Sequence, residues 1–364
     1  MKRNRIILAL WAVALVSAAC TAVDIDRPEQ EQIRFQVARY GVPLHTTKAH
    51  SDYKDGFQGV PFGAYVWFKG EDPADNTNFM VNQKISYVAA SNLWAPEGTT
   101  FYWPKSGSLD FICYSPYSDS GNPVVTENKI SFSSWDVGAN PDVDLLYADK
   151  MTGLTQNATT YYYNGVPVLF RHALSRLQFS MSLAYSEITS PTGDKTKWEV
   201  TVNSATLKDV RRQGSVDIDY DGSVWTLPAS RVWTPDSGKM DIALDCSGLS
   251  TFTGTDAQTL GEGFLVMPQA LDLGQTLVLN ITIKTWRDTG SGYAVDPLIT
   301  EANVDVQAPL SCASLTGWGI NQSIKYNIKL SPSKTVVTDQ PTEITFDPAT
   351  ADWESVTFNA EIKL

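Results

Sequence analysis

Leu177-Gln178-Phe179-Ser180-Met181-Ser182-Leu183 is the stretch that decides the fold, because large apolar and polar side chains alternate along it without a break. A period of two puts all the apolar side chains on one face, which indicates a half-buried β-strand. Helical periodicity is scarce elsewhere, and clusters of Gly, Pro, Asn, Asp and Ser separate the strand-like runs. The pattern predicts an all-β protein built as an antiparallel β-sandwich. The other strand-like runs are 33–37, 64–68, 109–114, 200–202, 277–283 and 326–330.

The length of the chain predicts two domains. Its 364 residues are more than one hydrophobic core usually supports. We expect an N-terminal β-sandwich over residues 33–172 and a C-terminal β-sandwich over residues 173–364. A polar stretch at 189–195 is either a linker between domains or a hairpin inside the second one.

The first twenty residues have the features of an export signal that ends at a cysteine. Three basic residues precede an apolar run over 6–19, and small residues come directly before Cys20. This order predicts a signal peptide over residues 1–19, and the run is shorter than the ~20 residues that span a bilayer. The segment resembles the lipobox of bacterial lipoproteins, although Ser17 stands where that motif usually has leucine. The resemblance implies lipidation of Cys20 and a polar tether over 20–32; an ordinary secretory signal is the alternative.

Charge and cysteine usage exclude several classes of function. Removing the three basic residues of the signal from the 28 in the chain leaves 25 against 40 acidic residues, a net charge of −15. Such a chain has no electrostatic basis for binding nucleic acid. After Cys20, the cysteines are Cys113, Cys246 and Cys312. They have no zinc-type spacing, so we expect buried free thiols, with one disulfide among the three left open.

No pattern of catalytic residues is present. His45 and His50 lie in a polar, loop-like neighbourhood, and His172 lies in a strand-like run, where a structural role is expected. The chain lacks a nucleophile elbow, a zinc-protease helix motif and a phosphate-binding glycine loop. The acidic pairs 142/144 and 217/219 are interpreted as solvated charges. We therefore predict a protein that is not an enzyme and that has no catalytic residues, no metal site and no cofactor.

An ordered set of motifs resembles the fimbrillin-like (Mfa-like) lipoprotein family of Bacteroidia. Phe170-Arg171-His172-Ala173-Leu174-Ser175-Arg176-Leu177 is similar to the family's F-x-H-A-L-[AS]-[KR]-L strand. The other similar segments follow in the family's order over most of the chain: 103–116, 144–148, 261–268, 318–328 and 344–353. The resemblance implies a subunit of a type V fimbria with two tandem transthyretin-like β-sandwiches. It also implies a surface-exposed lipoprotein at the cell outer membrane that takes part in adhesion.

The resemblance further implies assembly by strand exchange with other fimbrial subunits. A trypsin-like protease would cut after the first strand, at Lys48 or alternatively at Arg39, and the strand over 33–37 would be removed. Lysine at position 48 departs from the arginine usual in the family. The extreme C-terminus, 355–364, is a candidate donor strand because apolar residues alternate along it; they are Val356, Phe358, Ala360, Ile362 and Leu364. Burying the four bulky ones would contribute on the order of 10 kcal/mol before association costs. The alternative is that this segment is the last strand of its own domain.

Two other functions remain open from the sequence. Eleven tryptophans fit a glycan-binding surface lipoprotein of a polysaccharide-uptake system, provided that several share one exposed face. A hydrolase on a β-sandwich scaffold would need two carboxylates facing each other at ~5–10 Å, and no pair in the sequence is favoured over the others.

Overall fold

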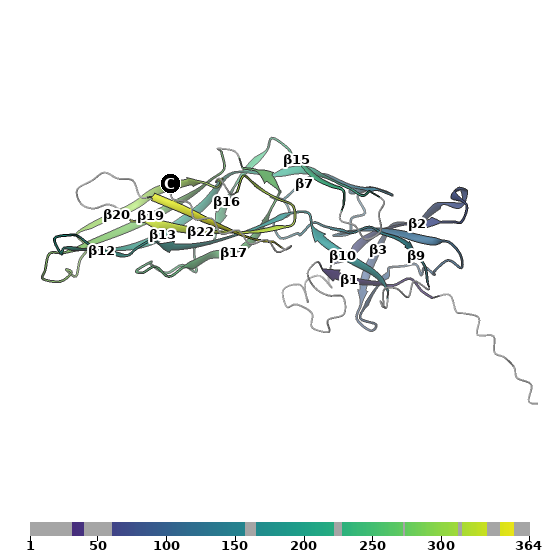
Figure 1. Ribbon diagram of the computed structural model, residues 1–364, viewed down its shortest axis with the longest axis horizontal. Helices are drawn as coiled ribbons and strands as arrows, with labels where there is room; N and C mark the ends of the chain where they lie inside the picture. The colour runs from purple at the N-terminus through teal and green to yellow at the C-terminus, as the bar shows by residue number, and fades with distance from the viewer. Residues whose placement is uncertain are drawn as a thin grey trace, which may run out of the picture.

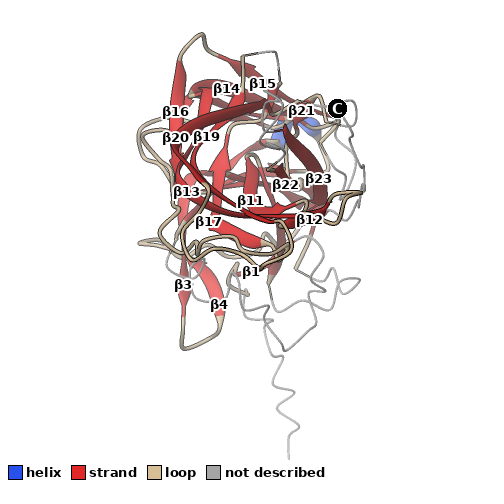
Figure 2. Cartoon of the chain, turned by 90° about the vertical axis from the view of Figure 1, so that its left-hand side faces the viewer, coloured by secondary structure: helices blue, strands red, loops and turns tan. Residues whose placement is uncertain are grey.

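The computed structural model describes residues 31–39, 60–156, 165–221, 228–271, 274–311, 315–332 and 343–352. These residues are almost entirely strands and loops, which confirms the all-β prediction (Figures 1 and 2). One short 3-10 helix, η1 (Pro73–Asp75), interrupts them, and the Asp72 side chain accepts a hydrogen bond from the Ala74 amide at its start. Within the described part of the chain, no helix is long and apolar enough to cross a membrane.

The N-terminal sheet closes on itself. Its strand order is β2-β3-β4-β1-β10-β8-β5-β9, and an additional pairing of β2 with β5 completes a ring. Apolar side chains inside this ring form one core, which includes Phe62, Phe111 and Phe170. The strands are β1 (Phe35–Arg39), β2 (Phe62–Lys69), β3 (Thr77–Val88), β4 (Leu93–Pro96), β5 (Ser108–Ser115), β8 (Leu146–Ala148), β9 (Met151–Leu154) and β10 (Val166–His172).

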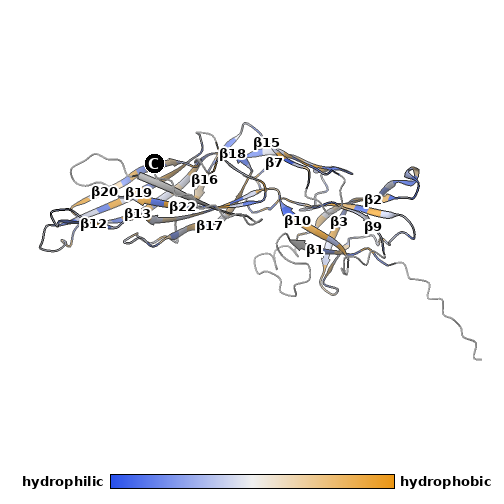
Figure 3. Ribbon diagram, in the orientation of Figure 1, coloured by the Kyte–Doolittle hydropathy of each residue, from blue (hydrophilic) through white to orange (hydrophobic). Residues whose placement is uncertain are grey.

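The C-terminal part contains two sheets, and apolar side chains from both form a second core. Leu177, Phe179, Met181 and Leu183 are all buried, so the alternation that decides the fold places one face of β11 (Ser175–Leu183) in this core. Figure 3 shows hydrophobic and hydrophilic residues interspersed along the strands of this part of the molecule. One sheet has the order β17 (Gln258–Val266), β11 (Ser175–Leu183), β22 (Gln322–Ser331) and β23 (Glu343–Asp352). The other has the order β12 (Glu187–Thr189), β13 (Lys195–Arg211), β19 (Thr276–Asp288) and β20 (Ile299–Pro309), with β16 (Lys239–Leu244) on β13.

A smaller sheet lies between these parts and takes strands from both sides of residue 172. Its order is β15 (Ser230–Pro235), β14 (Gln213–Asp219), β7 (Lys129–Asp136) and β6 (Val124–Thr126). Figure 1 shows β7 and β15 between the two ends of an elongated molecule. Its core shares residues of both halves, among them Trp67 and Met267. The chain passes from the N-terminal ring to the C-terminal sheet between His172 and Ser175, and the division into domains at 172/173 stays a prediction.

Three local features refine the sequence interpretation. β12 and β13 pair across 189–195, with Thr189 opposite Lys195, so this stretch is a hairpin. β1 with β10 and β11 with β22 are parallel pairs, whereas the other strand pairs of the described residues are antiparallel. Strands β18 (Gln269–Ala270) and β21 (Gly317–Trp318) form a two-stranded sheet that completes the fold.

Candidate functional site

The strand β1 fills a slot in the N-terminal ring. It runs parallel to β10, with Phe35 opposite Val166, and meets β4 where Phe35 lies opposite Trp94. The Val166 amide donates a hydrogen bond of 2.7 Å to the carbonyl of Arg34. Because β1 is the only connection between β4 and β10 in the described sheet order, its removal would open the ring at that point.

Two side chains of this segment enter the core. Ile33 is 1% exposed and Phe35 is 0% exposed, whereas Val37 is half-buried. The Phe35 ring packs edge-on against Phe62 at 5.6 Å and Phe111 at 5.9 Å between centroids. At about 1.5–3 kcal/mol for each fully buried large side chain, Ile33 and Phe35 contribute on the order of 3–6 kcal/mol. The segment is therefore held mainly by two apolar anchors two residues apart.

Aromatic side chains line the slot, and Gly165 lets the backbone of the bound strand approach closely. The ring centroid of Phe62 lies 5.4 Å from that of Trp94 and 5.4 Å from that of Phe170. These contacts hold in place the aromatic rings on which Phe35 packs. A Cβ at Gly165 would lie 2.7 Å from the carbonyl oxygen of Arg34, which only glycine avoids. The slot thus suits an extended segment with large apolar side chains at alternate positions, as in recognition by strand addition.

Most of the sequence-predicted site residues lie outside the described residues. These are Cys20, Lys48, His45, His50 and the donor-strand residues from Val356 to Leu364. Arg39 is the last residue of β1, where its backbone is opposite Phe170. The roles of these residues in lipidation, processing and strand donation remain predictions.

Cys113 and Cys246 are free thiols in the structure, as expected. Burial raises the pKa of Cys113 far above its ordinary value, and burial also raises that of the half-buried Cys246. Burial therefore favours the protonated form of both thiols. Cys312 lies outside the described residues.

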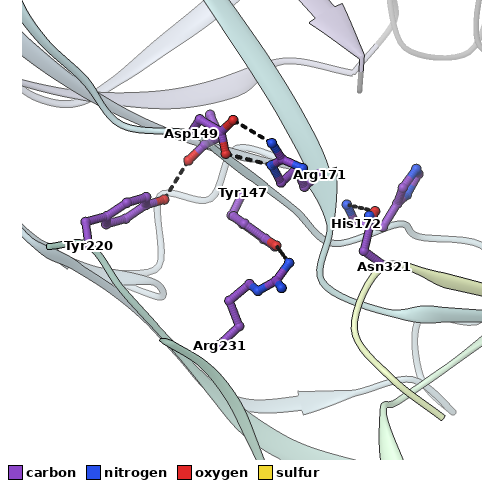
Figure 4. A network of polar contacts seen from close by, with 8 residues as sticks. Tyr147, Asp149, Arg171, His172, Tyr220, Arg231 and Asn321 are labelled. Carbon is purple, nitrogen blue, oxygen red and sulfur yellow. Dashed lines mark hydrogen bonds and ion pairs between the residues drawn. The ribbon is translucent and has the colours of Figure 1, made fainter. Parts of the chain in front are cut away.

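His172 belongs to a network of polar contacts beside the smaller sheet (Figure 4). Its ring Nδ1 contacts a carboxylate oxygen of Asp144, and its amide donates to Asn321 Oδ1 at 3.2 Å. The interpretation of Asp144 as a solvated charge is wrong, because this carboxylate is paired with a histidine 28 residues away. The contact with Asn321 joins β10 to the residue that precedes β22, and both contacts satisfy polar atoms of the buried His172.

A buried ion pair next to His172 was missing from the sequence interpretation. Arg171 binds Asp149 in a bidentate way, with Nε–Oδ1 at 2.7 Å and Nη2–Oδ2 at 2.8 Å, and both side chains are nearly inaccessible. The Tyr220 hydroxyl donates to the Ala148 carbonyl at 2.6 Å, and burial holds the pKa of Tyr220 well above its ordinary value. The sequence feature that could have indicated this ion pair is Arg171, a charged residue at the end of an otherwise apolar run. The network fastens the smaller sheet to the N-terminal ring.

The described tryptophans offer no broad exposed face. Six are buried, and Trp135 and Trp233 are half-buried, with the Trp233 indole donating to the Ala173 carbonyl at 2.7 Å. The buried ones are Trp67, Trp94, Trp103, Trp198, Trp286 and Trp318. Among the same residues, no group of three or more His, Cys, Asp or Glu side chains could hold a metal ion.

The closed N-terminal β-ring and the two C-terminal sheets over a second core define an all-β sandwich protein. The fimbrillin-like family model matches residues 47–353, and the chain belongs to this family. The membership indicates a fimbrial or adhesion role at the cell surface and association with other fimbrial subunits.

Three of the solved structures similar to this chain are cell adhesion or fimbrial proteins. A candidate cell adhesion protein of Bacteroides uniformis is 15% identical with a TM-score of 0.51, covering 89% of this chain and 99% of its own. A similar protein of Bacteroides ovatus is 13% identical with a TM-score of 0.45, covering 89% and 98%. A C-terminally truncated tip fimbrial protein of Porphyromonas gingivalis is 9% identical with a TM-score of 0.39, covering 82% and 96%. A search among curated protein sequences gave no match.

Proposed function

We propose that the protein is a structural or accessory subunit of a surface fimbria, assembled by exchange of a strand in the β1 slot. The observation that supports this most is the position of β1, which closes the ring between β4 and β10 with Phe35 in the core. In this proposal the protein reaches the outer membrane as a lipoprotein acylated at Cys20. It carries no cofactor and acts on no substrate.

A proteolytic cut in residues 40–59 would separate β1 from β2 in the covalent chain. Lys48 lies in this stretch, and Arg39 at the end of β1 is the alternative site. After the cut, only non-covalent contacts hold β1, chiefly those of Ile33 and Phe35. A strand that reproduces these contacts and extends them can replace β1, because the slot presents unpaired backbone groups and an apolar floor.

In this proposal the strand that replaces β1 is the C-terminal segment of a neighbouring subunit. Val356, Phe358 and Ala360 have the same spacing as Ile33, Phe35 and Val37. In this register Phe358 takes the position of Phe35 among the aromatic rings, and the small Ala360 takes the half-buried position. A slip of one residue would direct polar side chains into the slot instead. Ile362 and Leu364 would add contacts beyond those that β1 makes.

The test uses a pair of substitutions on opposite faces of the segment. Phe358→Asp should abolish polymerisation after treatment with a trypsin-like protease, and Asn359→Asp should not, because it adds the same charge on the other face. Size-exclusion chromatography and electron microscopy measure the polymers. The Phe358→Asp monomer should melt like the wild type. A large drop in its melting temperature would place the segment in its own domain and contradict donation.

A further inference from the structure

A lysine outside the β1 slot is buried beside an amide. Lys150 lies in the two-residue link between β8 and β9 and is only 4% exposed. Its Nζ donates a hydrogen bond of 2.9 Å to Oδ1 of Asn128, in the turn between β6 and β7. Lysine is rarely buried without an ion pair. A buried lysine that contacts an amide oxygen is therefore a candidate for a chemical role.

Burial favours the neutral amine of Lys150, which is the form that can act as a nucleophile. Burial lowers the pKa of Lys150, while the nearby Asp110 and Glu127 partly oppose the shift. Glu127 is engaged by Lys69 at 2.7 Å. Asp110 is itself buried on β5, and its Oδ1 accepts a hydrogen bond of 2.8 Å from the Gly153 amide. Lys150 is therefore easier to deprotonate than a solvated lysine, and a buried carboxyl group lies nearby.

We propose that Lys150 and Asn128 form an intramolecular isopeptide bond. The neutral Lys150 Nζ attacks Cγ of Asn128, which is one bond beyond the oxygen that Nζ already contacts. A turn of the amide about its Cβ–Cγ bond presents the carbon to the amine. The Nζ–Cγ bond forms, the Cγ–Nδ2 bond breaks, and one molecule of ammonia leaves. The proton that Nζ loses passes to the departing nitrogen, so the reaction needs no other reactant.

The exposed position of Asn128 at its turn lets the ammonia escape directly into solvent. The bond would join the β6–β7 hairpin of the smaller sheet to the β8–β9 link of the N-terminal ring. The two sheets would then be held together covalently beside the Arg171–Asp149 pair. When the molecule is pulled along its length, the force would pass through the bond and not through residues 129–149. Such resistance to extension suits a subunit of a surface fibre.

Mass spectrometry of the purified full chain tests the bond. The denatured wild type should be lighter by one ammonia than the mass calculated for the chain as processed at its N-terminus, and the Lys150→Arg variant should have the full calculated mass. Lys69→Arg is the matched control, since Lys69 contacts Glu127 and should leave the bond in place. Trypsin does not cut after an acylated lysine, so peptide 106–129 should be recovered joined to 130–171.

Peptide mapping of the wild type shows whether Asn128 and Lys150 are linked, even where a variant fails to fold. Recovery of 106–129 and 130–150 as separate peptides would overturn the proposal. So would a full-mass wild-type protein, or Asn128 converted to aspartate without a link to Lys150.

Discussion

Phe35→Ala is the substitution that probes the slot most sharply within the intact chain. Phe35 is fully buried and packs against Phe62 and Phe111, so truncation removes a large apolar surface and leaves a cavity between the two rings. Substitutions of this kind cost about 3–5 kcal/mol. Domains of this size are stable by about 5–15 kcal/mol, so the change should remove a large share of the stability of the N-terminal ring.

Urea unfolding and hydrogen exchange measure this effect together. The amides of β10 that face β1 should exchange faster in Phe35→Ala, whereas those of β13 in the C-terminal sheet should not change. Arg34→Ala is the matched control on the same segment, since its backbone carbonyl keeps the bond to Val166. A loss below about 1 kcal/mol in Phe35→Ala, with unchanged exchange in β10, would refute the view that Phe35 anchors the strand.

Three other substitutions test separate parts of the account. Cys20→Ser should abolish labelling by an alkyne fatty acid that marks the wild type, and equal labelling of both would refute the anchor. Arg171→Met should destabilise the protein by about 3–5 kcal/mol in thermal or urea unfolding, because it leaves the buried Asp149 charge unpaired; an unchanged stability would show that the pair does not stabilise the N-terminal ring. Lys129 and Ser131 lower the pKa of Asp217, so the stabilisation from this carboxylate is present above its unfolded pKa of about 3.9 and is lost as pH falls through the lower folded value. Asp217→Asn should remove this part of the acid dependence of the melting temperature, and an identical pH profile would contradict it.

Local alternation predicted strands well where no bulge interrupts it. The run from Leu177 to Leu183 is a strand with its apolar face in the core, as expected. Around 200–202 the sequence indicated only a short strand, yet β13 extends over Lys195–Arg211. The pairing with β19 shifts between Val202 and Ser204, and this irregularity breaks the period of two on which the prediction depends.

Contacts between distant segments were beyond the sequence reasoning. The parallel pairing of β1 with β10 joins residues about 130 positions apart, and nothing in either segment alone specifies its partner or direction. The smaller sheet was missed for the same reason, since β7 and β14 meet only in the fold. The pairing of Asp144 with His172 likewise depends on how β10 is placed. The sequence did indicate that the segment 33–37 is a strand, and the structure places its apolar residues in a core.

A density map of the assembled fimbria tests the central claim most directly. The account predicts that residues 31–39 are absent from each subunit in the polymer. A strand from the neighbouring subunit should lie between β4 and β10 instead, with Phe358 between Phe62 and Phe111. A polymer in which β1 still occupies its slot, with Phe35 in place, would contradict strand exchange as the mode of assembly.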